Sequence, residues 1–233
     1  MVKSRDVKRV LRQVASPAKA EVSRRFFKTG PGEYGEGDRF LGVIVPQIRK
    51  LARDFEDLPL GEVKLLLKSP WHEERLAALF ILILQYRKGD ERIKGSIFRL
   101  YCQSTRYINN WDLIDSSAEH IIGPHLQEGS RALLHRWSKS KSLWERRISI
   151  LSTFHYIKQW EFKETLKLAK TLLHDEQDLI HKAVGWMLRE IGKRDRKVEE
   201  KFLRRHCQEM PRTMLRYAIE HFSHAERAWY LLA

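Results

Sequence analysis

The sequence predicts an all-α fold, built as a solenoid of about a dozen short helices. Apolar residues recur at three- and four-residue spacing almost throughout the chain, as in Val7, Val10, Leu11 and Val14. This spacing is typical of amphipathic helices. Alternating, strand-like segments bounded by Asn-Gly or Asp-Gly turns do not occur, so no sheet is expected.

Prolines mark where the helices are expected to begin. Pro17, Pro46, Pro59, Pro70 and Pro211 each open a helical stretch, at a position where a missing N–H costs little. A compact irregular bundle is the alternative to a solenoid, because the helix period is irregular. The expected helices cover residues 17–28, 46–56, 60–68, 72–87, 90–106, 110–127, 130–138, 143–158, 161–173, 178–194, 196–208 and 211–221.

Composition excludes two classes of protein. Hydrophobic residues make up 42% of the chain and charged residues 32%, which is too apolar for a disordered chain and too charged for a membrane protein. The longest apolar run, Ala77 to Leu84, is far shorter than a bilayer span and predicts a buried helix. The charged first residues contain no apolar stretch of the kind that a secretory signal needs, so a cytoplasmic location is expected.

The charge balance indicates a polyanionic partner. Lys and Arg total 44 against 30 Asp and Glu, a formal net charge of +14, and nucleic acid is the leading candidate. The alternative is that the charge serves only solubility. Cys102 and Cys207 are far apart and outside any CxxC pair, so we expect buried free thiols and neither a disulfide framework nor a zinc site.

Two patterns resemble ligand sites without the context that such sites need. Residues 30–35 satisfy GxGxxG, but a helical pattern precedes them where a dinucleotide fold has a strand, and acidic residues follow. We expect a flexible loop there. His221 and His224 are spaced for one helix face but lack a third ligand, so surface histidines and no metal site are expected.

Two stretches combine aromatic and charged side chains. Trp111 and Asp115 are four residues apart and share a helix face. Their other interpretation is a core tryptophan beside a solvated or capping carboxylate. Lys182, Trp186 and Arg189 form a second same-face stripe, in which cations flank an indole. Between residues 131 and 147 six residues are basic and one is acidic, a pattern typical of a phosphate-tracking surface.

Three blocks of the sequence resemble the AlkD-type alkylpurine DNA glycosylases, which are HEAT-like repeat DNA alkylation repair enzymes. Phe40-Leu41-Gly42-Val43-x-x-Pro46-x-x-Arg49 is similar to an early motif of that family. Trp111-Asp112-x-x-Asp115-Ser116 resembles its catalytic segment, and Lys182-Ala183-x-Gly185-Trp186-x-Leu188-Arg189-Glu190 resembles its late motif. The blocks occur in the family's order and span most of the chain.

The resemblance implies a single HEAT-like repeat domain over residues 1–233, whose concave basic surface grips duplex DNA. It places Trp111, Asp115 and Trp186 at the family's catalytic positions, and Arg147 matches an arginine near the DNA backbone. Phe26 stands where the family has a tyrosine, and His155 where it has a lysine. With Lys182 and Arg189, these residues are the expected DNA contacts. A monomer that needs no metal and no cofactor is expected.

The implied reaction is hydrolysis of the glycosidic bond of cationic alkylated purines, on a base that stays in the duplex. The ionised Asp115 would stabilise the developing sugar cation, and the two indoles would pack against the sugar and the lesion. One rival is a non-catalytic HEAT-like protein that recognises distorted or branched DNA. The other is a protein-interaction solenoid whose charge promotes solubility.

Overall fold

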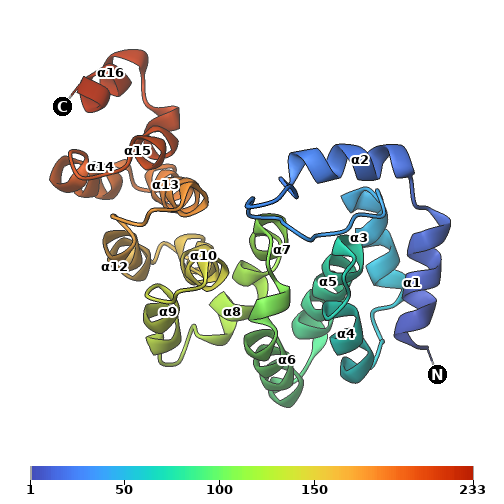
Figure 1. Ribbon diagram of the computed structural model, residues 1–233. Helices are drawn as coiled ribbons and strands as arrows, with labels where there is room; N and C mark the ends of the chain where they lie inside the picture. The colour runs from blue at the N-terminus through green and yellow to red at the C-terminus, as the bar shows by residue number, and fades with distance from the viewer. Residues whose placement is uncertain (1, 233) are drawn as a thin grey trace. The chain divides into compact units, whose positions relative to one another are not determined.

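The computed structural model describes residues 2–232, which form helices joined by short loops (Figure 1). The described residues contain no strand; Arg39 and Trp71 form one isolated β-bridge. The all-α prediction is therefore confirmed. The chain divides into two compact units. The first ends at Ser117, and the second begins at Ala118. The single domain over residues 1–233 stays a prediction.

The first unit contains seven α-helices and a 3₁₀ turn among its described residues. Its long central helix is α5, whose apolar run is buried as predicted over Ala77–Ile83, while Leu84 is half-buried. Helices α3, α4 and α6 pack against α5, and α1 packs against its first turn. The elements are α1 (Ser4–Gln13), α2 (Pro17–Phe26), α3 (Val45–Asp54), α4 (Leu60–Leu67), α5 (His72–Lys88), α6 (Glu91–Gln103), η1 (Thr105–Tyr107) and α7 (Trp111–Asp115).

The second unit is built around α13, which packs against α10, α12, α14 and α15. A Cβ atom on Gly185 would lie 2.4 Å from the carbonyl oxygen of Met214, so glycine lets α13 and α15 approach closely. The elements are α8 (Ala118–His125), α9 (Ala132–Trp137), α10 (Leu143–Ser152), α11 (Phe154–Ile157), α12 (Lys163–Thr171), α13 (Asp178–Gly192), α14 (Arg196–His206), α15 (Arg212–Ala218), η2 (Ile219–His221) and α16 (His224–Leu232).

Two of the expected helices each divide into two α-helices, and hydroxyl side chains lie at both breaks. The range 110–127 divides into α7 and α8, where the Ser117 hydroxyl donates to the Leu113 carbonyl at 2.6 Å. The range 143–158 divides into α10 and α11, where Thr153 donates to the Ile150 carbonyl at 2.6 Å. Such bonds offer the backbone an alternative to the helical ladder. Helices α1 and α16 lie outside the expected ranges.

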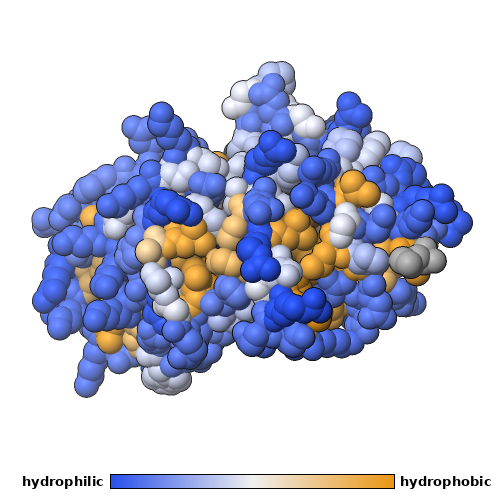
Figure 2. All heavy atoms as spheres, turned by 90° about the horizontal axis from the view of Figure 1, so that it is seen from below, coloured by the Kyte–Doolittle hydropathy of each residue, from blue (hydrophilic) through white to orange (hydrophobic). Residues whose placement is uncertain are grey.

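The other local expectations can be compared directly with the structure. Pro17 and Pro46 lie in the first turns of α2 and α3, and Pro59 and Pro211 cap α4 and α15, as predicted. Cys102 and Cys207 form no disulfide within residues 2–232, and they are half-buried rather than buried. Figure 2 shows apolar patches between hydrophilic residues on one face. Among residues 2–232, no helix combines the length and apolar character that a membrane crossing requires.

The segment between α2 and α3 has no regular structure, and buried groups hold its backbone. The N–H groups of Leu41 and Gly42 donate to the Glu73 carboxylate at 2.8 and 2.7 Å, and that of Val43 donates at 3.2 Å. Gly42 has a φ of +79°, and a Cβ there would lie 2.1 Å from the Ser16 carbonyl oxygen. This position therefore requires glycine.

We predict that Gly42→Ala lowers the free energy of unfolding by about 2–3 kcal/mol, because it combines a left-handed backbone with a clash against α2. Urea unfolding followed by circular dichroism measures the change. Gly61→Ala is the matched control, because Gly61 lies in α4 with no atom within 4 Å of its ideal Cβ. The control should be neutral or stabilising by up to about 1 kcal/mol. Equal effects of the two substitutions would contradict the account of Gly42.

Candidate functional site

The first turn of α5 carries a buried network of charges. The two ring nitrogens of His72 lie 2.9 Å from Asp38 Oδ2 and 2.8 Å from Asp112 Oδ2. Arg75 donates to the other Asp38 oxygen at 2.6 Å, and the Asn110 amide donates to Asp38 at 3.3 Å. Asp38 belongs to the segment after α2 and Asp112 to α7, so His72 ties both to α5.

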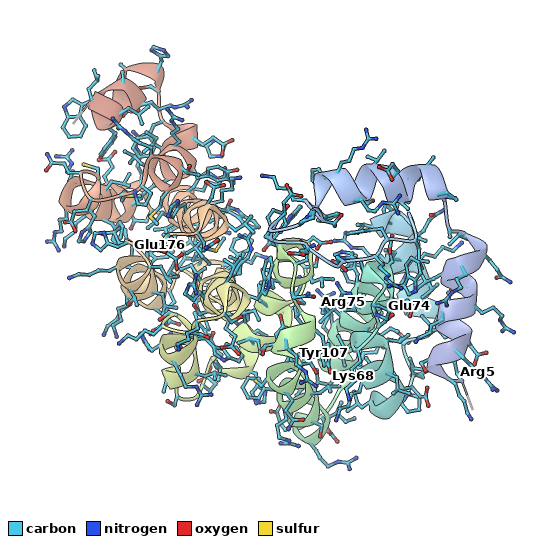
Figure 3. All side chains as sticks on the ribbon, in the orientation of Figure 1. Arg5, Lys68, Glu74, Arg75, Tyr107 and Glu176 are labelled. Carbon is cyan, nitrogen blue, oxygen red and sulfur yellow. The ribbon has the colours of Figure 1, made fainter. Side chains whose placement is uncertain are left out.

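Figure 3 places Glu74 and Arg75 on this turn, with Glu74 toward α1. The Glu74 carboxylate lies 3.0 Å from Arg12 and 3.4 Å from Lys8, both of α1. The charged residues at the start of α5 therefore bind three separate segments: α1, the segment after α2, and α7. None of the predicted site residues belongs to this network. Two of them, Trp111 and Asp115, lie in α7, which the network holds through Asp112.

His72 is a cation in this network. Burial alone would lower the pKa of its imidazole, but the charges and hydrogen bonds of Asp112 and Asp38 outweigh burial and raise the pKa to about 9. Both partners of the ring are acceptors, so both ring nitrogens donate. Burial acts on Asp38 as well, yet the bonds from His72 and Arg75 lower the pKa of its carboxyl.

An aromatic cluster surrounds Trp111, the first residue of α7. Its ring centroid lies 5.3 Å from that of Phe27 and 5.7 Å from that of Phe26. The indole N–H donates to the Tyr34 hydroxyl at 3.3 Å. Phe40 stacks on Phe27 at 5.0 Å. The loop of residues 30–35, where no ligand site is expected, thus supplies a partner to the predicted catalytic indole.

Helix α7 has only five residues, and Trp111 and Asp115 are its two ends. The Asn110 side chain accepts from the Trp111 N–H at 2.8 Å and caps the helix. Asp115 is partly exposed. Burial is the main cause that raises the pKa of the Tyr101 hydroxyl, and the Asp115 charge adds to it. Trp111 and Asp115 therefore lie at the two ends of one short helix of the first unit, and their joint role in a site stays a prediction.

The second unit places the other predicted indole on α13. Trp186 is partly exposed, its ring centroid lies 5.7 Å from that of Phe154, and its N–H donates to Glu190 at 3.3 Å. Lys193 pairs with the same carboxylate oxygen at 2.7 Å. Trp186 is therefore held between an aromatic ring and an ion pair, with part of the indole open to solvent.

The predicted DNA contacts differ widely in exposure. Phe26 exposes 62% of its surface, whereas Arg147 exposes 4% and donates to the Leu179 carbonyl. Lys182 pairs with Asp178 at 2.8 Å, and Arg189 pairs with Glu220. Burial is the main cause that lowers the pKa of the His155 imidazole, so this ring does not supply the charge of a lysine.

Within the basic stretch of residues 131–147, half of the cations have partners in the protein. Arg131 pairs with Glu161, and Arg146 bonds to Asp175 at 2.6 Å. Arg136, Lys139 and Lys141 are exposed instead. Among the described residues no group of three or more His, Cys, Asp or Glu side chains has the arrangement of a metal site. His221 and His224 are exposed, as predicted.

The sequence profile of a family described as "DNA alkylation repair enzyme" matches residues 7–222. The chain belongs to this family. A solved structure titled "Predicted DNA alkylation repair enzyme from Enterococcus faecalis" shares its fold, with a TM-score of 0.72 and 14% sequence identity. The similarity covers 90% of this chain and 97% of that one. No curated protein matches the chain.

The matched residues 7–222 include all the cations and indoles described above as predicted site residues. The fold likeness is consistent with the predicted helical repeat solenoid; the concave basic surface stays a prediction. The buried network of His72, Asp38, Asp112 and Arg75 was not predicted. One signal was available: the charged residues 72–75 directly precede an apolar run, so the first turn of a buried helix had to bury charge.

We predict that His72 stabilises the protein most below pH 6.5, and that this stabilisation is lost as the pH rises through about 9. The sign follows because the pKa is higher in the folded state than in the unfolded chain. The unfolding free energy should fall by an amount on the order of 3 kcal/mol across this interval. Urea unfolding at several pH values measures the change. His72→Gln, which does not titrate, should flatten the profile, and an unchanged profile would contradict the assignment.

Proposed function

We propose that this member of the family is a DNA glycosylase, which binds damaged duplex DNA and hydrolyses the N-glycosidic bond of cationic alkylated purines. The observation that supports it best is α7, which carries the clustered Trp111 at one end and the partly exposed Asp115 at the other. The family description adds DNA alkylation as the type of damage. We further propose that the lesion stays in the duplex.

Hydrolysis of this glycosidic bond needs only modest catalysis, because the alkylated base is already a good leaving group. A purine alkylated at a ring nitrogen carries positive charge, and its bond to the sugar carbon breaks with both electrons passing to the base. Positive charge then develops on the deoxyribose. Water attacks the sugar carbon and loses a proton, so the products are a free alkylated base and an abasic site.

In this proposal Asp115 faces the sugar. An ionised carboxylate there stabilises the charge that appears only in the transition state, and it can orient the attacking water. Trp111 and Trp186 offer electron-rich ring faces, each attracting a cation by about 0.5–2 kcal/mol depending on desolvation. Phe26, exposed beside Trp111, extends the aromatic surface of the first unit.

DNA binding in the second unit depends on its exposed cations. Arg136, Lys139 and Lys141 are accessible for phosphate contacts, and Lys182 and Arg189 are partly so. We propose that the buried Arg147 acts indirectly, because its bond to Leu179 holds the start of α13, the helix that carries Lys182 and Trp186. An enzyme of this kind would act as a monomer on DNA in the cytoplasm.

One assay separates the enzyme from a non-catalytic DNA-binding protein of the same fold. Duplex DNA containing 7-methylguanine or 3-methyladenine is incubated with the protein, and released base is measured by mass spectrometry. Release above the spontaneous rate is expected. Binding without any release would overturn the glycosylase and leave recognition of distorted or branched DNA as the function.

We predict that Asp115→Asn slows base release about a hundredfold in single-turnover assays, equivalent to a loss of about 3 kcal/mol. Binding should change little, because the amide keeps the size of the side chain but not its charge. Asp54→Asn, at an exposed carboxylate of α3, is the matched control and should match the parent. Equal rates for Asp115→Asn and the parent would return Asp115 to a structural role.

Duplex binding should depend steeply on salt. For contacts to about six phosphates, log K should fall against log salt with a slope of about −5. Replacing both Lys139 and Lys141 by Ala should make the slope shallower by about two, because each substitution leaves one phosphate without its cation. Lys88→Ala is the control, because this lysine pairs with Glu56 in the first unit at 2.5 Å. A salt-independent affinity would leave the charge as a solubility device.

A further inference from the structure

The last helix, α16, begins after residue 222, where the match to the family ends, and it carries an exposed indole. Trp229 exposes 57% of its surface, while the adjacent Tyr230 exposes 5%. The two rings meet edge to face, with centroids 4.8 Å apart at 84°. Tyr230 also contacts the Phe222 ring at 5.6 Å. A buried aromatic pair therefore supports an indole whose own face remains open to solvent.

Trp229 lines a cavity of about 220 Å³ between α14 and α16. Two carboxylates of this cavity are paired: Arg196 bonds to Glu200 at 2.7 Å and pairs with Glu226. Arg196 also lies over the Phe222 ring at 4.2 Å, which fixes its position. The acidic side chains beside Trp229 are thus neutralised within the protein.

The remaining cations of α14 point to a polyanion. Arg204 lines the same cavity, and its side chain is 69% exposed although it forms an ion pair with Glu200 at 3.7 Å. Lys197, Lys201 and Arg205 follow at four-residue spacing, in the helical row next to the cavity-lining residues. All three are exposed, and none forms an ion pair within residues 2–232.

We propose that this α14–α16 surface, made of Trp229, Arg204, Lys197, Lys201 and Arg205, binds single-stranded nucleic acid. An unpaired base stacks on Trp229, and the flanking phosphates follow the cation row of α14. Proteins that bind single strands combine these two elements, a charged track and an aromatic platform. Within a duplex the bases stack on one another, so only the terminal base pairs offer a face to the indole.

The charge around Trp229 favours this occupant over an apolar protein partner. Arg204 lines the cavity together with Trp229, three more cations occupy the neighbouring row of α14, and the carboxylates of the cavity already have partners. The proposal does not depend on the glycosylase activity, because none of its residues belongs to the predicted catalytic set. Failure of one proposal therefore leaves the other standing.

The test measures binding of the full chain to a fluorescein-labelled oligothymidine by anisotropy. Trp229→Ala should weaken binding about tenfold, because one base no longer stacks on the indole. Trp229→Phe should retain more of the affinity, since a smaller ring face remains. Trp160→Ala is the matched control in the same unit, where Trp160 is 65% exposed. Replacing Lys197 and Lys201 by Ala should reduce the salt slope by about 0.7 for each phosphate that is no longer neutralised.

A blunt-ended duplex and anionic lipid vesicles provide the other arms of the test. Intrinsic tryptophan fluorescence should be quenched by the oligothymidine in the parent and much less in Trp229→Ala. Equal binding of the single strand by Trp229→Ala and the parent would overturn the proposal, as would an equal loss on the duplex. Binding to vesicles but not to the single strand would identify an anionic surface and also overturn it.

Discussion

Three side chains at the start of α5, those of His72, Glu73 and Arg75, hold the segment between α2 and α3, and Trp111 depends on that segment for its neighbours. Glu73 accepts three backbone N–H groups that no helix or sheet would otherwise satisfy. His72 links Asp38 of the segment to Asp112 of α7. The stacked rings of Phe27 and Phe40 close over this network. The short helix α7, which carries the proposed catalytic carboxylate, is thus positioned by contacts with α5 and with the segment after α2.

This network is stable only as a whole. Burying a carboxylate is costly unless it is paired and hydrogen-bonded, and removing one partner of a buried pair costs about 3–5 kcal/mol. Asp38 has His72 and Arg75 as partners, and Asp112 has His72. Each charge therefore fixes the next, and the segment has one favoured position. With only five residues, α7 has too few backbone hydrogen bonds to be stable alone. The bond from His72 to Asp112 holds its first turn in place.

Charge in this protein is divided between structure and surface. Of the cations that mark the basic stretch 131–147, Arg131, Arg146 and Arg147 bind groups within the second unit. Their neighbours on the same stretch, Arg136, Lys139 and Lys141, face solvent instead. The same division recurs on α14. Arg196 pairs with Glu200 and Glu226, whereas the adjacent row of Lys197, Lys201 and Arg205 is exposed. A formal net charge of +14 therefore overstates the charge that a ligand meets at any one place.

The sequence by itself determined the helical fold, most helix starts and the family motifs, because periodicity, proline position and local spacing are properties of contiguous residues. The placement of Trp111 and Asp115 four residues apart on one helix belongs to this class. Only the tertiary structure decided that His72 joins Asp38 to Asp112, residues 34 and 40 positions away. It also decided that Arg147 is buried while Lys139 is exposed. Both outcomes depend on which helix faces pack together, and packing brings together residues whose separation along the chain carries no local signal.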